Sequence, residues 1–346
     1  MRQAAQILDA SGQRTGSPSR ARCSRRWLFV AATLAVLLQS PQALRAQDAA
    51  SFPNQPIRVV IPAGAGGTLD VIARAIGQKL TERLGQPIVI ENRAGANTII
   101  GTEFAAKANP DGYTILCAAA ASIVTNPAIY AKLRYSIADF APLSMTASFP
   151  FILSVANSVP AQNIRELVEY AKKNPDKVNA GGSTAGHQLM TALFRERTGA
   201  PVQYIPYKGM NEVTTALAGG QLTMSFLTAS NAGQINSGAV RALAVTSAQR
   251  DARFPNVPTM AEAGVEGLVA LSWAGFLAPA RTPAAIVNKL SSEMAAIVKL
   301  PEVRKQLAAA NLDPVGNTSA EFAKVIADDF KTWAAVAKAA NIQINQ

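Results

Sequence analysis

Short apolar segments typical of β-strands alternate along this chain with longer segments that have the periodicity of helices. The first apolar segment, 57–61, leads into a glycine-rich turn at 64–67, and a helical pattern follows as far as Leu84. Gly85 and Pro87 then end that helix, and a second apolar segment begins. Continuous β-branched and aliphatic strands separated by helices indicate a parallel sheet covered on both faces. The sequence therefore predicts an α/β fold.

The alternation falls into two blocks that are joined by long apolar stretches. One stretch covers 140–157 and the other covers 268–280. Each block contains a strand, a glycine-rich turn and a helix, at 57–84 in the first block and at 178–194 in the second. Two such turns that face each other across a cleft would direct two sets of backbone N–H groups at one ligand. This geometry suits a small molecule with one or two carboxylates.

Basic residues outnumber acidic residues, but the excess is unevenly placed. The chain has 346 residues and a formal net charge of +11, with 33 Lys and Arg against 22 Asp and Glu. Seven of the Arg and one of the acidic residues lie within 1–46, which leaves a surplus of five positive charges on the rest. That remainder has no dense run of Lys or Arg, so we do not expect nucleic acid as a partner.

Residues 1–46 show the order of features of an export signal. A basic region at 20–26 precedes an apolar run at 27–38, and small residues follow as far as Ala46. The apolar run is too short to span a bilayer. The segment 24–29 resembles a twin-arginine signal, and the general secretory route is an equal alternative. We expect cleavage after Ala46 and a periplasmic mature protein.

The first glycine-rich turn has the composition of an anion site. Gly64, Gly66 and Gly67 precede a helix, whose first N–H groups and dipole favour negative charge. Leu69 stands where a dinucleotide-binding motif needs its third glycine, and no Gly-Lys-Ser/Thr follows. A carboxylate and a phosphate both remain possible ligands, and a purely structural turn is the alternative. Asp70 is expected to complement the helix dipole and to restrain the loop.

The second turn, 181–187, contains Ser183 and the single histidine of the chain. It falls short of the nucleophile elbow G-x-S-x-G because Ala185 replaces the last glycine. His187 follows Ser183 by four residues, whereas that hydrolase order places the histidine far downstream. Ser183 and Thr184 can cap the following helix or donate to a ligand. We therefore expect no enzyme activity and no catalytic residue.

The supply of metal ligands is equally limited. Besides His187, the chain has two cysteines, and Cys23 would leave with the export signal. Cys117 ends an apolar strand and is expected to be a core thiol. One histidine and one cysteine are too few for a transition-metal site. We expect no metal and no cofactor.

Several motifs in order along the chain resemble the Bug family, the periplasmic solute-binding proteins of tripartite tricarboxylate transporters. They are PNQPIRVVIPAGAGGTLDVIARAIGQKLTERLGQPIVIENRAGAN, PDGYTIL, IPYKGMNEVTTALAGGQL, RALAVTS with PNVPTMAEAG, WAGFLAPARTPAAIVNKL, and a final Trp with AKAANI. The resemblance covers 50–346. It implies a two-lobed periplasmic-binding-protein fold of type II, the Venus flytrap, with two crossing strands between the lobes. Lobe 1 would comprise 52–152 and 276–346, and lobe 2 would comprise 153–275.

The resemblance also implies the function. The protein would capture a small organic acid in the cleft between the lobes and deliver it to membrane transporter subunits, as a monomer. A ligand sensor of the same fold, which presents its closed form to a membrane receptor, is the alternative, because both would use the same cleft. The candidate ligand-binding residues are Ala63, Gly64, Ala65, Gly66, Gly67, Thr68, Asp70, Ser122, Gly182, Ser183, Thr184, His187, Tyr207 and Thr228.

The chain departs from the family pattern at positions that bear on the ligand. Ala63 stands where an aromatic residue is usual, and Ala94 stands where a proline is usual. Gln188 takes the usual place of a histidine, with His187 one position earlier, and Leu227 takes the place of a frequent Asp. The small side chain of Ala63 leads us to expect room for an aromatic or branched acid bulkier than a compact dicarboxylate.

Overall fold

The structure is a computed structural model that describes residues 51–228 and 231–345. These described residues belong to one compact unit. The export signal expected at 1–46 lies outside the described residues and stays a prediction.

Strands and helices alternate through most of the described chain. The strands are β1 (Ile57–Ile61), β2 (Ile88–Asn92), β3 (Thr114–Ala119), β4 (Phe140–Ala156), β5 (Asn179–Gly182), β6 (Gln203–Pro206), β7 (Met224–Thr228), β8 (Val240–Val245), β9 (Leu271–Pro279) and β10 (Asp313–Pro314). The helices are α3 (Thr68–Leu84), α4 (Ile99–Ala106), α5 (Asn126–Ile129), α6 (Ile164–Lys173), α7 (Ala185–Thr198), α8 (Met210–Ala218), α9 (Ala232–Asn236), α10 (Ala284–Val298), α11 (Pro301–Ala309) and α12 (Ser319–Ala339). A π-helical turn at Ala121–Thr125, which the sequence did not predict, precedes α5.

The strands form one sheet with parallel ends and an antiparallel centre. Its order is β2-β1-β3-β9-β4-β7-β5-β6, and β8 and β10 also pair with β4. Strand β1 is parallel to β2 and β3, and β5 is parallel to β6 and β7. Strands β4 and β9 pair antiparallel with their neighbours. The α/β fold expected from the alternation of strands and helices is confirmed. The expected parallel sheet is found only at the two ends, because the long strands β4 and β9 pair antiparallel with their neighbours.

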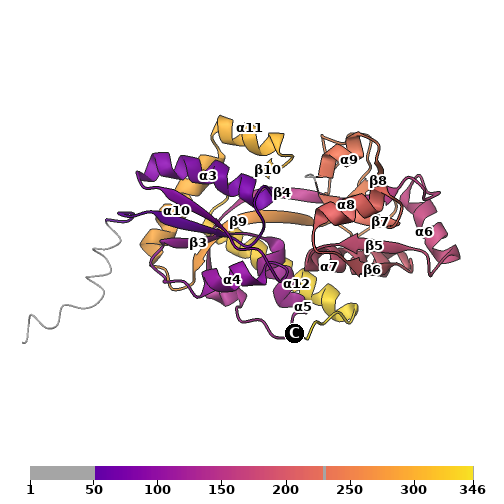
Figure 1. The fold of residues 1–346 in the computed structure, drawn as a ribbon, viewed down its shortest axis with the longest axis horizontal. Coiled ribbons are helices and arrows are strands. Elements are labelled where there is room, and N and C mark those ends of the chain that lie inside the picture. Colours follow the sequence, from indigo (N-terminus) through magenta and orange to yellow (C-terminus); the bar gives the residue numbers. More distant parts are fainter. Residues whose placement is uncertain (1–50, 229–230, 346) are drawn as a thin grey trace, which may run out of the picture. The chain divides into compact units, whose positions relative to one another are not determined.

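Strands β4 and β9 run between the two parallel parts of the sheet (Figure 1). From Phe140 to Pro150, β4 pairs with β9, and from Phe151 onward it pairs with β7 and β8. Strand β9 also pairs with β3. The two crossing strands expected from the sequence are therefore present. The exact lobe boundaries, 52–152 with 276–346 and 153–275, remain a prediction.

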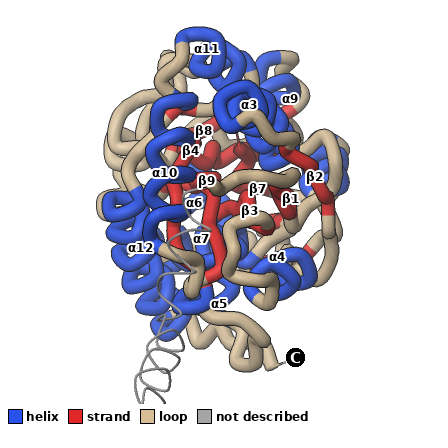
Figure 2. The backbone as a smooth tube through the Cα atoms, turned by 90° about the vertical axis from the view of Figure 1, so that its left-hand side faces the viewer, coloured by secondary structure: helices blue, strands red, loops and turns tan. Residues whose placement is uncertain are grey.

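Alternate residues of β1 pack on opposite faces of the sheet. Val59 and Ile61 belong to the apolar cluster that α3 and α10 complete, whereas Val60 belongs to the cluster that α4 and α12 complete. Figure 2 shows these helices around the strands. Each fully buried Val or Ile side chain contributes about 1.5–3 kcal/mol relative to an exposed one. This packing holds the end of β1, and with it the following turn, in a fixed position.

Both glycine-rich turns leave the carboxyl ends of parallel strands. Strand β1 ends at Ile61 and α3 begins at Thr68; β5 ends at Gly182 and α7 begins at Ala185. In open parallel sheets, ligands bind beyond the carboxyl ends of the strands, where helix N-termini converge. The fold therefore positions these two turns for binding.

Candidate functional site

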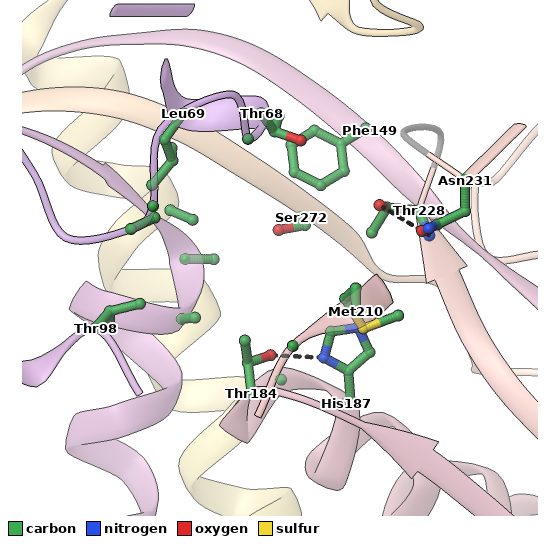
Figure 3. Close-up of a pocket in the computed structure, with 18 of the residues that line it drawn as sticks. Thr68, Leu69, Thr98, Phe149, Thr184, His187, Met210, Thr228, Asn231 and Ser272 are labelled. Atoms are coloured by element: carbon green, nitrogen blue, oxygen red, sulfur yellow. Dashed lines mark hydrogen bonds between the residues drawn. The ribbon is translucent and has the colours of Figure 1, made fainter. Parts of the chain in front are cut away.

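A pocket of about 810 Å³ lies at the ends of both turns and along the crossing strands. Its volume is within the usual range of small-molecule sites. In Figure 3, Thr68 and Leu69 of α3 lie on one side, and Thr184 and His187 lie on the opposite side. Ser272 of β9 lies between them, and Phe149 of β4 lies beside Thr68. Residues distant in sequence thus form one lining.

The first turn is fixed by a buried carboxylate. Asp70 is only 4% exposed, and its Oδ2 accepts the N–H of Gly66 at 3.0 Å. The same carboxylate accepts two hydrogen bonds from Arg74, at 2.9 and 3.1 Å. The bonds from Arg74, and next from Gly66, lower the pKa of Asp70 against the opposing effect of burial. Asp70 therefore restrains the loop as an anion, as expected.

The N-terminus of α3 keeps donors for a ligand. Along α3, Val71 is the first residue whose backbone N–H donates to the helix backbone; its acceptor is the Gly67 carbonyl, at 3.1 Å. The preceding N–H groups of Thr68 and Leu69 belong to the set that a helix leaves without intrahelical acceptors. Both residues line the pocket. Because Asp70 already uses the N–H of Gly66, these two groups are better placed to hold an anion.

The second turn presents a histidine to the pocket. Nδ1 of His187 lies 2.7 Å from Oγ1 of Thr184, the N-cap residue of α7. The imidazole packs edge-on against Phe151 of β4, with ring centroids 5.7 Å apart. Burial lowers the pKa of His187 to about 4, so the ring is neutral at physiological pH. A neutral imidazole offers one donor and one acceptor nitrogen.

Two further helix N-termini reach the same pocket. Gly209 and Met210, at the start of α8, line it, and so does Thr98, the N-cap of α4. Thr98 has a positive φ of 71° and accepts hydrogen bonds from Ser122 Oγ at 3.0 Å and from Asn126 Nδ2 at 3.2 Å. A non-glycine residue adopts this left-handed conformation only when its surroundings impose it. Ser122 and Asn126 supply that constraint.

The pocket contains most of the residues proposed from the sequence. Those that line it are Ala63, Gly64, Ala65, Gly66, Gly67, Thr68, Thr184, His187 and Thr228. Asp70, Ser122, Gly182, Ser183 and Tyr207 are not part of the lining. Three of them support lining residues instead: Asp70 bonds Gly66, Ser122 bonds Thr98, and Gly182 leaves space for the imidazole of His187.

Other lining residues were missed in the sequence. The loop 208–212 was quoted as part of a family motif, and its pattern of glycine before a helix was the signal that could have revealed another N-terminus. It brings Lys208 and Glu212 to the pocket. Phe149, Phe151 and Leu271 come from the crossing strands and Trp333 comes from α12. Their contribution depends on tertiary packing that no local pattern reveals.

Neither a metal cluster nor a membrane span is found in the described part of the chain. Within 51–228 and 231–345, no group of three or more His, Cys, Asp or Glu side chains could hold a metal ion. No helix of those residues is both long and apolar enough to cross a bilayer.

Cys117 is buried, as expected for a core thiol. Its burial raises the pKa of the thiol, so little of the reactive thiolate is present.

A family model described as the tripartite tricarboxylate transporter family receptor matches residues 72–342. The chain belongs to this receptor family. Protein BugT of Bordetella pertussis (strain Tohama I) is 35% identical to this family member over 84% of this chain and 91% of its own. The resemblance to the Bug family inferred from sequence motifs is thus confirmed.

Two solved structures place the fold of this receptor-family member among ligand-bound relatives. The structure of Rpa4515 from R. palustris with adipate has a TM-score of 0.78 and 33% identity, over 84% of this chain and 99% of that one. MatC from Rhodopseudomonas palustris with bound malate has a TM-score of 0.75 and 27% identity, over 82% and 99%. The two-lobed periplasmic-binding-protein fold is therefore established.

Proposed function

We propose that this protein is an extracytoplasmic solute-binding protein that captures a small organic acid for a tripartite tricarboxylate transporter. The observation that carries the proposal is the convergence of the N-termini of α3, α7 and α8 on one partly apolar pocket. Helix N-termini bind anions through ordered N–H groups and through the helix dipole. The adipate and malate bound to the two related structures support a carboxylate as that anion.

The turn before α3 is the proposed anchor for one ligand carboxylate. The N–H groups of Thr68 and Leu69 would bind its oxygens, while Asp70 holds the turn in place. Because these donors are already ordered, binding an anion there loses little conformational entropy. Nothing is done to the bound acid, which the protein holds and hands on unchanged.

The apolar part of the pocket lining favours an apolar ligand body. Phe149, Phe151, Met210 and Leu271 line it with apolar surface, and Ala63 adds no bulk. Pockets of this type gain affinity by burying apolar ligand area, at about 25 cal/mol per Å². We infer that the acid carries an aliphatic, aromatic or branched segment next to its carboxylate. We propose that the ligand contacts the pocket-lining residues that the sequence predicted.

The charged lining residues balance one another. Lys208 and Glu212 are both exposed, and they are four residues apart along the chain. Neither glycine-rich turn contains a cationic side chain. Binding should therefore weaken less with added salt than binding to an arginine clamp would.

We further propose that the protein is a periplasmic monomer, which delivers the acid to the membrane subunits of the transporter.

A stability screen tests the binding function. The chain from Gln47 onward is titrated with adipate, malate, benzoate and, as a neutral control, adipamide. A bound acid at 100 times its dissociation constant should raise the free energy of unfolding by about 2.7 kcal/mol. A screen in which none of the three acids stabilises the protein contradicts the proposal.

The transport role needs a separate test in cells. Deleting the gene in its native host should abolish uptake of the radiolabelled acid, and the wild-type gene should restore it. A variant that folds but no longer binds the acid should not restore uptake. If the deletion strain takes up the acid normally but loses its transcriptional response to it, the result would favour the alternative function, a ligand sensor that acts through a membrane receptor.

A further inference from the structure

His187, which lines the pocket, has a buried polar atom that nothing in the described protein satisfies. The residue is only 5% exposed, and its Nε2 is buried without a hydrogen-bond partner among residues 51–228 and 231–345. In Figure 3 the ring projects from α7 into the pocket, with Nδ1 directed at Thr184. A buried polar group without a partner costs about 1–3 kcal/mol, so its position calls for an explanation.

The surrounding residues hold the ring in this orientation. Thr184 fixes Nδ1 and Phe151 packs edge-on against the imidazole. Gly182 lies so close that a Cβ there would clash with the Cβ of His187 and lie 2.9 Å from its Cγ. The ring therefore has little freedom to turn Nε2 toward another partner.

The bond to Thr184 couples the direction of its hydroxyl hydrogen to the tautomer of the His187 ring. A hydroxyl has one hydrogen to donate, and the Thr184 hydroxyl makes no capping bond to the backbone of α7. Oγ1 of Thr184 lies 2.7 Å from Nδ1 of His187, so the hydroxyl can donate its hydrogen to Nδ1 when Nδ1 is the acceptor. The remaining hydrogen of the neutral ring is then on Nε2. In that tautomer, the buried Nε2 of this pocket-lining residue is an N–H donor without an acceptor among the described residues.

We propose that His187 is a specificity-determining residue, which donates its Nε2–H to an oxygen at the second end of an acid whose first carboxylate is held at α3. The inference rests on the proposed function and narrows it. The ligand is an acid with oxygen atoms at both ends and an apolar segment between them. Phe149 and Met210 line the pocket where that segment would lie.

The donor is insensitive to pH over the physiological range. Burial lowers the pKa of His187 to about 4, so the ring stays neutral well below neutrality. The charged lining residues are Lys208 and Glu212, and Asp70 beyond the first turn is paired with Arg74. A neutral donor selects for hydrogen-bonding geometry more than for charge.

Nuclear magnetic resonance tests the donor directly, because the chain has a single histidine. Long-range proton–nitrogen spectra of ¹⁵N-histidine-labelled protein, without ligand, should show the hydrogen on Nε2 and no titration between pH 5.5 and 8. A hydrogen on Nδ1, or a titration midpoint above 5.5, overturns the inference whatever the protein binds.

A matched pair of ligands tests the specificity. Adipate and hexanoate have the same carbon chain, but hexanoate lacks the second carboxylate. His187→Leu should weaken adipate binding about tenfold in calorimetry and leave hexanoate binding within twofold, since only adipate meets Nε2. His187→Gln, which keeps an N–H donor, should recover most of the adipate affinity. Circular dichroism and thermal melting verify that both variants fold.

The outcomes separate this inference from the proposed function. Equal weakening of adipate and hexanoate by His187→Leu assigns the histidine a packing role and overturns the inference alone. If the wild-type protein binds hexanoate or benzoate but not adipate, the inference that the ligand has oxygen atoms at both ends is overturned. The proposed binding function is then unaffected. Failure of adipate, malate, benzoate and hexanoate to bind overturns both.

Discussion

The carboxylate of Asp70 accepts the backbone N–H of Gly66 at 3.0 Å, and this bond closes the turn that enters α3. Gly66 has a φ of 78° at that point, a conformation that side chains disfavour. The sequence thus supplies both a glycine that can adopt the turn and an acid four residues later that holds it. Ligand donors at Thr68 and Leu69 follow from this local arrangement.

Removing the Asp70 carboxylate should loosen the turn. We expect Asp70→Ala to lower the free energy of unfolding by about 1–3 kcal/mol, because the Gly66 N–H and Arg74 lose their acceptor. Adipate affinity should fall as well. Asp70→Asn, which keeps an acceptor for Gly66, should retain more affinity than Asp70→Ala. Equal adipate affinity in all three proteins, measured by calorimetry, would contradict a restraining role.

The same carboxylate predicts a pH dependence of stability. Its pKa is lowered in the folded protein, by Arg74 and then by Gly66, so folding favours the ionised form. This contribution is complete above the unfolded pKa of about 4 and is lost as pH falls through the lower folded value. Urea denaturation between pH 7 and pH 3 should therefore show a smaller acid loss for Asp70→Asn than for the wild type. An identical loss would refute this assignment.

The conformation at Gly66 provides a second, sharper comparison. Gly66→Ala meets no neighbour, but it forces a side chain into the left-handed region, at a cost of about 1–2 kcal/mol. Gly67 has a negative φ of −79°, which alanine adopts readily. The Cβ that Gly67→Ala adds would lie 3.5 Å from the Gly64 carbonyl oxygen, an ordinary van der Waals contact. Chemical denaturation should find Gly66→Ala destabilised and Gly67→Ala close to the wild type. The reverse order would contradict the structure.

Gly182 should matter for binding although it does not line the pocket. A Cβ at this position would clash with His187 and lie 2.9 Å from Tyr204 Oη, so Gly182→Ala must displace the imidazole. We expect a loss of about 1–3 kcal/mol in stability and a weaker affinity for adipate. Gly233→Ala, where no atom lies within 4 Å of the new Cβ, is the matched control. Wild-type affinity in Gly182→Ala would show that the imidazole can move freely.

The exposed charges at the entrance to α8 should act in opposite directions. Lys208→Gln should weaken adipate binding by about 0.2–1 kcal/mol, and Glu212→Gln should strengthen it by a similar amount, because both residues line the pocket and remain solvated. The differences should shrink between 20 mM and 500 mM NaCl, as expected for screened charges. Calorimetry at both salt concentrations measures the effect. Changes of the same sign would argue against electrostatics.

The sequence predicted the fold more completely than the site. The periodicity of apolar residues predicted the helix α3, and Gly85 with Pro87 predicted its end, since these signals are local. The π-helical turn at Ala121–Thr125 was missed, as was the left-handed conformation of Thr98, because buried bonds from Ser122 and Asn126 stabilise it. Such contacts join residues more than twenty positions apart.

The candidate site divides in the same way. Gly64 to Thr68 and Thr184 with His187 were found because a glycine-rich turn before a helix can be recognised locally. Phe149, Leu271 and Trp333 reach the pocket only through the crossing of β4 and β9 and the packing of α12. Ser122 and Gly182 were candidate ligand-binding residues, but they do not line the pocket: Ser122 bonds Thr98, and Gly182 leaves space for His187.

The most direct test of the account is calorimetry with adipate and its neutral diamide, adipamide, at pH 7.5. The account predicts that adipate binds more tightly by about 1.5–3 kcal/mol, because the ordered N–H groups at α3 favour a charged acceptor. Adipate recovered from the protein should be chemically unchanged. Equal affinities for adipate and adipamide would contradict the claim that this pocket binds a carboxylate.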